Sequence, residues 1–471
     1  MELLDTIAAI STPHGKGGVA MLRVSGADAV AVASRVFVPR NGQPLGEVAS
    51  RTAVYGTILA PEEKGWVSVD DGIATVYRAP ASFTGEDTVE ICCHGGVLLT
   101  QTVLEALLTA GARMARAGEF TRRAHMNGKL GLSAAEALGS LLEASNRRQM
   151  TLAYGGLDGK LEKRSRAAYD ELLRVMSSVL ACIDFPDEDL AEMSREDMIA
   201  AVRAVRADLA ALSATYRTGH AVAEGIPTVI CGRTNVGKSS LYNCLVGREA
   251  AIVTDIEGTT RDVLSDTATL GGVTLRLYDT AGIRETDDRV ERIGIDRARA
   301  ALKDAELVLA LFDLTRPLTD DERALLDELV ARDVPRGTVI GLLNKIDAVC
   351  DQSISSEVCA AVTSKIAHTV SVSAKSGAGI EALADLIDTL FVDGALDLRH
   401  DAIVANARQN AALIRATEAL DRALEALTAD LPVDLCCVDL TAAMSALSEL
   451  DGREVNEDIV DAIFHNFCVG K

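Results

Sequence analysis

Gly232-Arg-Thr-Asn-Val-Gly-Lys-Ser239 has the pattern G-x-x-x-x-G-K-[ST] and lies near the middle of a chain of 471 residues. The apolar run Thr228-Val-Ile-Cys231 before it predicts a buried strand, and the residues from Ser240 onward predict a helix. A glycine-rich turn between a strand and a helix directs backbone N–H groups and the positive end of the helix dipole at one point, where phosphates can bind. We therefore expect Lys238 to reach the β- and γ-phosphates of a nucleotide and Ser239 to ligate Mg²⁺.

The composition limits the class of protein. With 48% hydrophobic and 25% charged residues the chain is typical of a soluble globular protein, and its length suggests about three domains. The net charge of −22 argues against a protein that coats nucleic acid without specificity. Because the N-terminus has no basic leader and no apolar run approaches ~18 residues, we expect a cytoplasmic protein that does not act at a membrane. Ten cysteines without a C-x-x-C pair predict reduced, mostly buried thiols.

Changes of pattern along the chain predict a multidomain α/β fold with four segments. Residues 1–128 alternate short apolar runs with glycines and predict a small α+β domain. Residues 129–222 are helical, and Ser133-Ala-Ala-Glu136 and Ser194-Arg-Glu-Asp197 predict two helix starts, the first as a capping box. Residues 223–392 alternate strands and helices, as in a doubly wound sheet of the Ras type, and residues 393–471 return to helix. We predict that the two helical segments form one domain into which the sheet domain is inserted.

Cations gather at the end of the first segment. A run of like charges is most often a solvated face, and we interpret this one so. Its members are Arg113, Arg116, Arg122, Arg123 and Lys129.

Four motifs follow the phosphate loop in the order that guanine-nucleotide hydrolysis requires. Gly258-Thr-Thr-Arg-Asp262 offers Thr260 to Mg²⁺, and Asp279-Thr-Ala-Gly282 offers the metal a carboxylate and the γ-phosphate an N–H group. The carboxylate of Asn344-Lys-Ile-Asp347 can accept two hydrogen bonds from guanine, which adenine cannot donate, and this selects GTP over ATP. Ser373-Ala-Lys375 can present an N–H group to guanine O6. The predicted GTP-binding residues are Asn235, Val236, Gly237, Lys238, Ser239, Ser240, Thr254, Asp255, Ile256, Glu257, Gly258, Thr259, Thr260, Asp279, Thr280, Ala281, Gly282, Asn344, Lys345, Asp347, Ser373, Ala374 and Lys375.

The residue that follows the Asp279 motif is Ile283, where Ras-like enzymes carry a glutamine that orients the attacking water. An apolar side chain cannot orient water, so hydrolysis needs groups from elsewhere. Asn235 could supply an oxygen to a monovalent cation beside the phosphates. On local sequence alone, Glu291 is either a solvated helix acid or the residue that orients the water.

Several stretches outside these motifs support a resemblance that runs from end to end. They are Gly17-Gly-Val-Ala-Met-Leu-Arg-Val-Ser-Gly26, Ser82-Phe-Thr-Gly-Glu-Asp87, His94-Gly-Gly96, Gly118-Glu-Phe120, Ile183-Asp-Phe-Pro-Asp-Glu188, Val290-Glu-Arg-Ile-Gly294 and the terminal Phe467-Cys-Val-Gly-Lys471. With the GTPase motifs, they make the chain similar to the MnmE (TrmE) family of tRNA-modification GTPases. The chain differs at Thr234, where many members have proline, and at Val469, which replaces isoleucine; neither change removes a ligand.

The resemblance implies a GTPase whose G domains pair across a homodimer when K⁺ is bound. It favours Glu291 as the acid that orients the attacking water. The implied metal ligands are Ser239 and Thr260 for Mg²⁺, and Asn235, Thr254, Ile256 and Thr259 for K⁺.

The resemblance also implies one-carbon chemistry. A tetrahydrofolate derivative, 5-formyl- or 5,10-methylene-tetrahydrofolate, would bind at Arg23, Glu90, Lys129 and Lys471. An FAD- and NADH-dependent partner of the MnmG type would form a heterotetramer with the chain. Together they would install an aminomethyl or carboxymethylaminomethyl group at C5 of the wobble uridine of certain tRNAs. Cys468 is the family's suspect residue in that chemistry, although a terminal thiol is often only a packed hydrophobe.

Two other classes of GTPase remain open on the sequence. An RNA-binding switch of ribosome assembly would carry a basic RNA module, and a membrane-surface GTPase would carry a basic amphipathic anchor. The chain has no recognisable segment of either kind.

Overall fold

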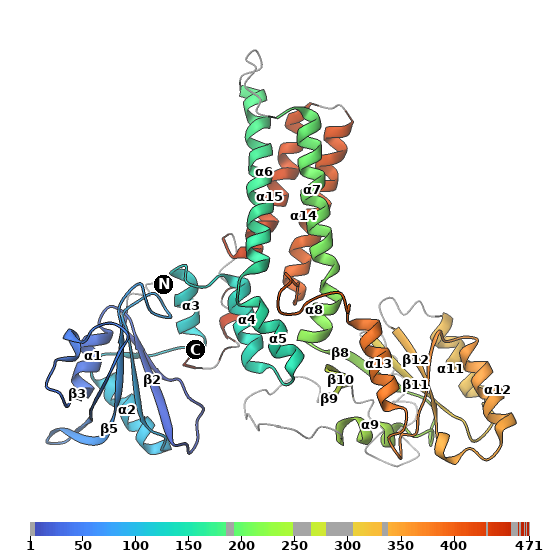
Figure 1. The fold of residues 1–471 in the computed structure, drawn as a ribbon, viewed down its shortest axis with the longest axis horizontal. Coiled ribbons are helices and arrows are strands. Elements are labelled where there is room, and N and C mark those ends of the chain that lie inside the picture. The colour runs from blue at the N-terminus through green and yellow to red at the C-terminus, as the bar shows by residue number, and fades with distance from the viewer. Residues whose placement is uncertain are drawn as a thin grey trace. The chain divides into compact units, whose positions relative to one another are not determined.

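A computed structural model describes residues 5–184, 193–247, 265–278, 305–331, 338–429 and 432–453, and residues 460, 463–465, 467, 469 and 470 near the C-terminus. The chain divides into two compact units. Their helices and strands are labelled in Figure 1. The first comprises residues 1–139, 157–170 and 444–471, and the second comprises residues 140–156 and 171–443. Among the described helices, none is long and apolar enough to cross a membrane.

The first unit is built on a seven-stranded sheet of order β3-β4-β5-β6-β2-β1-β7. Its strands are β1 (Ile7–Ile10), β2 (Val19–Ser25), β3 (Phe37–Pro39), β4 (Thr52–Glu62), β5 (Gly65–Tyr77), β6 (Thr88–His94) and β7 (Arg113–Met114). Neighbouring strands are antiparallel except β1 and β7, which are parallel. The helices α1 (Ala29–Val36) and α2 (Val97–Thr109) bury their apolar side chains against alternate residues of the sheet. This arrangement is the α+β fold predicted for the first segment.

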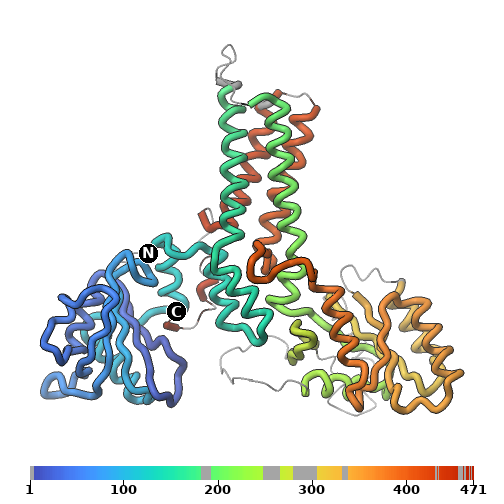
Figure 2. The backbone as a smooth tube through the Cα atoms, in the orientation of Figure 1, coloured from blue at the N-terminus to red at the C-terminus, as the bar shows by residue number. Residues whose placement is uncertain are grey.

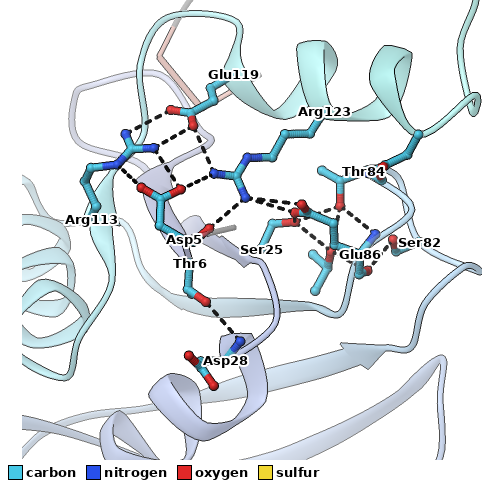
Figure 3. A network of polar contacts seen from close by, with 12 residues as sticks. Asp5, Thr6, Ser25, Asp28, Ser82, Thr84, Glu86, Arg113, Glu119 and Arg123 are labelled. Carbon is cyan, nitrogen blue, oxygen red and sulfur yellow. Dashed lines mark hydrogen bonds and ion pairs between the residues drawn. The ribbon is translucent and has the colours of Figure 1, made fainter. Parts of the chain in front are cut away.

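The helix α3 (Glu119–Met126) carries a buried ion network rather than a solvated basic face. Arg123 is only 1% exposed and donates hydrogen bonds to Asp5 Oδ1 at 2.8 Å, to Glu119 Oε1 at 3.0 Å and to both Glu86 carboxylate oxygens at 3.2 Å. Arg113 pairs with the same Asp5 and Glu119 carboxylates (Figure 3). The solvated-face interpretation is therefore wrong for Arg123, because acids from three separate segments surround it. The Arg113 side chain shares two of these acids and is 38% exposed.

The helix α4 (Leu132–Glu143) begins one residue before Ser133, so the predicted capping box at Ser133 is wrong. Glu162 of α6 (Lys160–Asp184) provides the cap instead. Its Oε1 accepts hydrogen bonds from the N–H groups of Ser133 at 3.0 Å and Ala134 at 3.3 Å. The Ser133 hydroxyl donates to the Leu450 carbonyl at 2.9 Å, which ties α4 to α15 (Cys436–Asp451).

The pKa of Glu162 predicts a pH dependence of stability. Burial raises this pKa above 4.5. A folded pKa above the unfolded one means that the folded chain binds more protons, so stability falls as the pH rises from 4.5 through the folded pKa. Glu162→Gln keeps an acceptor oxygen and removes the charge. We expect the stability of this variant relative to the parent chain to increase as the pH rises above 4.5, by at most about 1.4 kcal/mol per pH unit.

This gain is measured by urea unfolding followed by circular dichroism at a series of pH values from 4.5 upward. The matched control is Glu143→Gln at the exposed end of α4, the helix that Glu162 caps, and it should show no pH-dependent gain. An equal gain in both variants would contradict the assignment to the buried cap.

The helices of the second unit bring together segments far apart in the sequence. They include α5 (Arg147–Gly156), α7 (Arg195–Ala214), α8 (Tyr216–Ala223) and α14 (Ala407–Thr428). Ser194 caps α7 through a capping box, so the predicted helix start is confirmed. Arg206 of α7 pairs with Asp421 of α14 at 2.8 Å, and Arg195 donates to the Leu427 carbonyl at 2.8 Å. Figure 2 shows the green and red tubes of α7 and α14 side by side.

A six-stranded sheet of order β13-β12-β11-β8-β10-β9 forms the rest of the second unit. Its strands are β8 (Ile226–Cys231), β9 (Ser265–Leu270), β10 (Val273–Tyr278), β11 (Leu307–Asp313), β12 (Thr338–Asn344) and β13 (His368–Ser371). All neighbours are parallel except β9 and β10. Two apolar clusters pack the helices α9 (Lys238–Gly247) and α13 (Ile380–Phe391) on one face, and α11 (Asp320–Ala331) and α12 (Gln352–Thr363) on the other. Helices on both faces make this the predicted doubly wound sheet, and they explain its continuous apolar strands.

Candidate functional site

The predicted phosphate loop joins the end of β8 at Cys231 to the start of α9 at Lys238. Three of its residues have a positive φ, which is 143° at Gly232, 63° at Asn235 and 106° at Gly237. A Cβ atom at Gly237 would lie 2.3 Å from the side-chain nitrogen of Asn344, so only glycine fits there. The loop therefore has the strand–turn–helix setting that phosphate binding requires.

Lys238 is placed to meet an anion at this loop. Its ammonium donates to the carbonyl oxygens of Gly232 at 2.8 Å and Arg233 at 2.9 Å. Burial lowers the pKa of Lys238. Among the described residues, the partners of this half-buried ammonium are neutral carbonyls. A nearby negative charge would stabilise its charged form, so the loop fits a phosphate.

Asn344 connects the phosphate loop to the loop after β13. The side chain is 2% exposed, and its Nδ2 donates to the Val236 carbonyl at 2.7 Å. Its Oδ1 accepts the N–H of Ala374 at 3.0 Å. The buried Asn344 side chain thus fixes the position of the phosphate loop relative to the loop after β13, where the guanine base is predicted to bind.

The predicted guanine-binding residues lie at the ends of β12 and β13. Asp347 is exposed, and a hydrogen bond from the Ser373 hydroxyl lowers its pKa, so it is a carboxylate at neutral pH. Within the Ser373–Lys375 motif, the N–H of Ser373 donates to Ala378 and the N–H of Ala374 donates to Asn344. Among the hydrogen bonds of the described residues, none has the N–H of Lys375 as its donor.

Arg23 and Glu90 lie directly opposite each other on β2 and β6. Arg23 Nη2 is 2.7 Å from Glu90 Oε1, and the side chains are 11% and 18% exposed. The hydroxyl of Tyr77 donates to Glu90 Oε2 at 3.3 Å, and the rings of Phe83 and Phe120 lie 5.2 and 5.6 Å from the Arg23 guanidinium. A cation and an acid beside aromatic rings fit a ligand with a flat polar ring and a carboxylate.

The end of the chain is held against the same sheet. The Ser11 hydroxyl donates to the Gly470 carbonyl at 3.1 Å, and Val469 forms a bridge with Ala117. A Cβ atom at Gly470 would lie 2.3 Å from the Ile10 carbonyl oxygen, so this close approach requires glycine. Lys129 donates to the Pro80 carbonyl at 3.0 Å. These contacts bring distant parts of the sequence to the sheet that carries Arg23.

Comparisons with known proteins cover the whole chain. The family model "GTP-binding protein TrmE N-terminus" matches residues 6–129, and "MnmE helical domain" matches residues 132–468. A relative from Symbiobacterium thermophilum, named tRNA modification GTPase MnmE, is 43% identical over 99% of this chain and 99% of its own length. The chain belongs to the MnmE (TrmE) family. A Bacillus subtilis relative of the same name is 39% identical over 99% of this chain and 100% of its own.

Membership of the MnmE family confirms the resemblance found in the sequence. Among solved structures, Aquifex aeolicus Era bound to GDP and AlF4⁻ matches 41% of this chain and 65% of its own at 24% identity, with a TM-score of 0.28. The family assignment therefore rests on the sequence relatives, whose lengths match this chain almost completely.

Several residues predicted from the MnmE resemblance lie outside the described part of the chain. Phosphate-loop residues from Asn235 to Ser240 and the guanine-side motifs are described. The segments that follow α9 and β10 are not. The predicted site residues outside the described ranges are Thr254, Asp255, Ile256, Glu257, Gly258, Thr259, Thr260, Asp279, Thr280, Ala281, Gly282, Glu291, Cys468 and Lys471.

Sequence analysis missed one role and one residue at these sites. Asn344 was predicted only as a GTP-binding residue, although its side chain joins two loops of the protein itself. Tyr77 was not predicted at all, because it lies on β5 and reaches Glu90 only across the sheet. Its apolar strand gave no signal that the hydroxyl would meet an acid.

Proposed function

We propose that this member of the MnmE family is a cytoplasmic GTPase that takes part in tRNA modification. The observation that carries the proposal is the buried Asn344 side chain, which links a phosphate loop to a loop beside the ionised Asp347 carboxylate. A phosphate loop and a carboxylate that selects guanine, held in fixed positions by the same side chain, suit GTP. The relatives, which are named as tRNA modification GTPases, support the part in tRNA modification.

The proposal extends to the metal ions. Ser239 and Thr260 would hold Mg²⁺, and Asn235, Thr254, Ile256 and Thr259 would hold K⁺. The bound ions would neutralise charge that develops on the phosphates. The turn at Asn235, in the phosphate loop itself, supports a role for its side chain beside the phosphates. Glu291 would orient the attacking water, because Ile283 cannot.

The potassium proposal predicts a cation preference that depends on Asn235. The parent chain should hydrolyse GTP at least about tenfold faster in KCl than in NaCl, since a fitted cation stabilises transition-state charge. Asn235→Gly should remove most of this preference, because glycine keeps the positive φ of the loop but has no oxygen to offer. Phosphate release is measured in both salts. Asn235→Asp, which retains an oxygen, is the control, and equal rates of the parent chain in both salts would contradict the site.

The proposal also includes one-carbon chemistry. A tetrahydrofolate derivative would bind at Arg23, Glu90, Lys129 and Lys471, and the ion pair between Arg23 and Glu90 supports a ligand of mixed charge. A homodimer would act with an FAD- and NADH-dependent partner of the MnmG type in a heterotetramer. The product would be an aminomethyl or carboxymethylaminomethyl group at C5 of the wobble uridine. Contacts that hold Gly470 to β1 support a role for the adjacent chain end, including Cys468.

We also propose the domain boundaries 1–128, 129–222, 223–392 and 393–471, with the third domain inserted into a helical domain made of the second and fourth. The pairing of α7 with α14 across Arg206 and Asp421 supports the insertion. A protease fragment that lacks residues 223–392 should keep its two helical parts associated.

Mass spectrometry of tRNA nucleosides tests the function. Cells that lack this chain should lose the modified wobble uridine, and a plasmid copy should restore it. Unchanged nucleosides in the deletion strain would eliminate the modification role. Equal hydrolysis of ATP and GTP by the purified chain would eliminate guanine selection.

A further inference from the structure

The antiparallel hairpin of β9 and β10 is held at both of its ends. It is paired from Leu270 and Val273 beside the turn to Ser265 and Tyr278 at the open end. Along the sequence, β9 follows the predicted site residues up to 260, and β10 runs directly into those from 279. The ladder of backbone hydrogen bonds joins the open end of the hairpin to its turn. The strand β10 is also paired with β8, which leads into the phosphate loop.

The open end is linked to the phosphate-loop helix. The hydroxyl of Tyr242 on α9 hydrogen-bonds the carboxylate of Asp266 on β9. The helix α9 begins at Lys238 of the phosphate loop, so the hydrogen bond of Tyr242 connects the hairpin to the helix that follows this loop.

The turn of the hairpin lies against the start of α5. The Arg148 side chain packs on Gly272, where a Cβ atom would lie 3.0 Å from Arg148 Cδ. Asn146, the residue before α5, donates from Nδ2 to Thr274 Oγ1 at 3.1 Å. The Asn146 carboxamide oxygen accepts the Gln149 N–H at 2.9 Å, so the same side chain caps α5 and contacts the hairpin.

Arg148 also contacts the helix on the base side of the sheet. Its guanidinium forms a bidentate ion pair with Asp388 of α13, with Nη2 3.1 Å from Oδ2. The helix α13 follows the Ser373–Lys375 motif along the chain, and Gly271 of the hairpin turn lies against Ala384 of α13. Arg148 therefore contacts both the β9–β10 hairpin, which is linked to the phosphate-loop helix α9, and α13, which follows the predicted guanine-binding motif.

From α5 the contacts continue into the helices α7, α8 and α14 of the second unit, which we call the helical layer. Gln149 donates from Nε2 to the Ala223 carbonyl of α8 at 3.2 Å. Side chains of the pair Arg148 and Asp388 are 34% and 36% exposed, and such half-exposed ion pairs add little to stability. A joint of weak polar contacts can change its geometry at low cost, which suits a contact that responds to a ligand.

We propose that Asn146 and Arg148 are positioning residues that couple the nucleotide site to the helical layer through the turn of the β9–β10 hairpin. The proposal rests on the proposed function and assigns a place to the coupling between GTP hydrolysis and tRNA modification. It requires that the hairpin turn and α13 take different positions relative to α5 in different nucleotide states, since a ligand can shift only an equilibrium between states it binds differently.

The test uses full-length Asn146→Ala, Arg148→Ala and their double variant. Purified chains are assayed for GTP hydrolysis, with kcat and KM determined separately. The same variants are expressed in a deletion strain, and modified wobble uridine is measured by mass spectrometry. We expect hydrolysis within about twofold of the parent and a fall of at least about fivefold in modified uridine, the lower end of typical allosteric coupling.

A charge swap separates positioning from a merely structural role. Arg148→Asp alone should lose modification, and Arg148→Asp combined with Asp388→Arg should recover it. Arg206→Ala is the matched control, because it removes an ion pair of similar exposure, 41% and 46%, between α7 and α14. It should leave both hydrolysis and modification unchanged.

Three outcomes would overturn the coupling. Equal losses of hydrolysis and modification in Arg148→Ala would mean that Arg148 acts only on the nucleotide chemistry. Unchanged modification in the double variant would mean that the contact carries no coupling, and a charge swap without recovery would refute the paired role. Failure of the proposed function would appear differently, as a parent chain that does not restore the modified uridine.

Discussion

Asn344→Ala is expected to weaken GTP binding at least about thirtyfold. The substitution removes the donor to the Val236 carbonyl and the acceptor of the Ala374 N–H, both in a buried setting. Each buried polar group left without a partner costs about 1–3 kcal/mol. Two such groups cost about 2–6 kcal/mol. The variant must spend this free energy to hold both loops in the geometry that binds GTP, and the lower figure of about 2 kcal/mol corresponds to about thirtyfold in affinity.

Titration with a fluorescent GTP analogue measures this effect. Asn410→Ala on α14 is the matched control, since it deletes a carboxamide that accepts a hydrogen bond from Ser213 at 2.8 Å within the helices. It should bind the analogue as the parent does. Parental affinity in Asn344→Ala would show that the two loops keep their register without this side chain.

Arg123→Ala is expected to destabilise the first sheet by about 3–5 kcal/mol. The arginine is 1% exposed, and Glu119, which is 4% exposed, would lose one of its two cations. Removing one partner of a buried ion pair leaves an uncompensated charge, which accounts for a cost of this size. Urea unfolding followed by the fluorescence of Trp66 measures it, because this is the chain's single tryptophan and lies on β5 of the same sheet.

Arg40→Ala is the control for that measurement. It breaks the pair with Asp71 on the same sheet, whose side chains are 57% and 36% exposed, so we expect a loss below about 1 kcal/mol. Similar losses in the two variants would show that burial of the Arg123 network adds no stability.

The same network predicts an acid limit for this sheet. The Arg113 hydrogen bond, with help from Arg123, lowers the pKa of Asp5 from 3.8 to about 2. A folded pKa below the unfolded one contributes stability that is present above 3.8 and is lost as the pH falls towards about 2. Asp5→Asn should therefore flatten the acid side of the stability profile read from Trp66.

Local features of the sequence were sufficient for much of the architecture. The pattern around Lys238 predicts the strand, turn and helix of the phosphate loop, and all three are present. Gly271-Gly272 predicts a hairpin turn, and both residues have positive φ, at 62° and 85°. The predicted helix start at Ser194 is confirmed, because the two partners of its capping box are only three residues apart.

Other features depend on partners that the sequence does not place near each other. The cap of α4 comes from Glu162, which takes the N–H groups that the Ser133 motif was predicted to serve. The cations after residue 112 look solvated in sequence, yet Arg123 is enclosed by acids from the chain start, the segment before β6 and its own helix. The sequence around an arginine does not show whether its side chain faces water or pairs with a buried acid.

Short-range rules of backbone conformation, hydrophobic period and neighbouring hydrogen bonds can thus be read from this chain directly, and with them the family and the phosphate loop. The double role of Asn344, the ion network of Arg123 and the contact of Arg148 with the hairpin exist only after folding. Apart from Glu119, which lies on the same helix as Arg123, their partners lie at least 30 residues away along the chain. Burial, which sets the strength of each contact, is a property of the packed molecule.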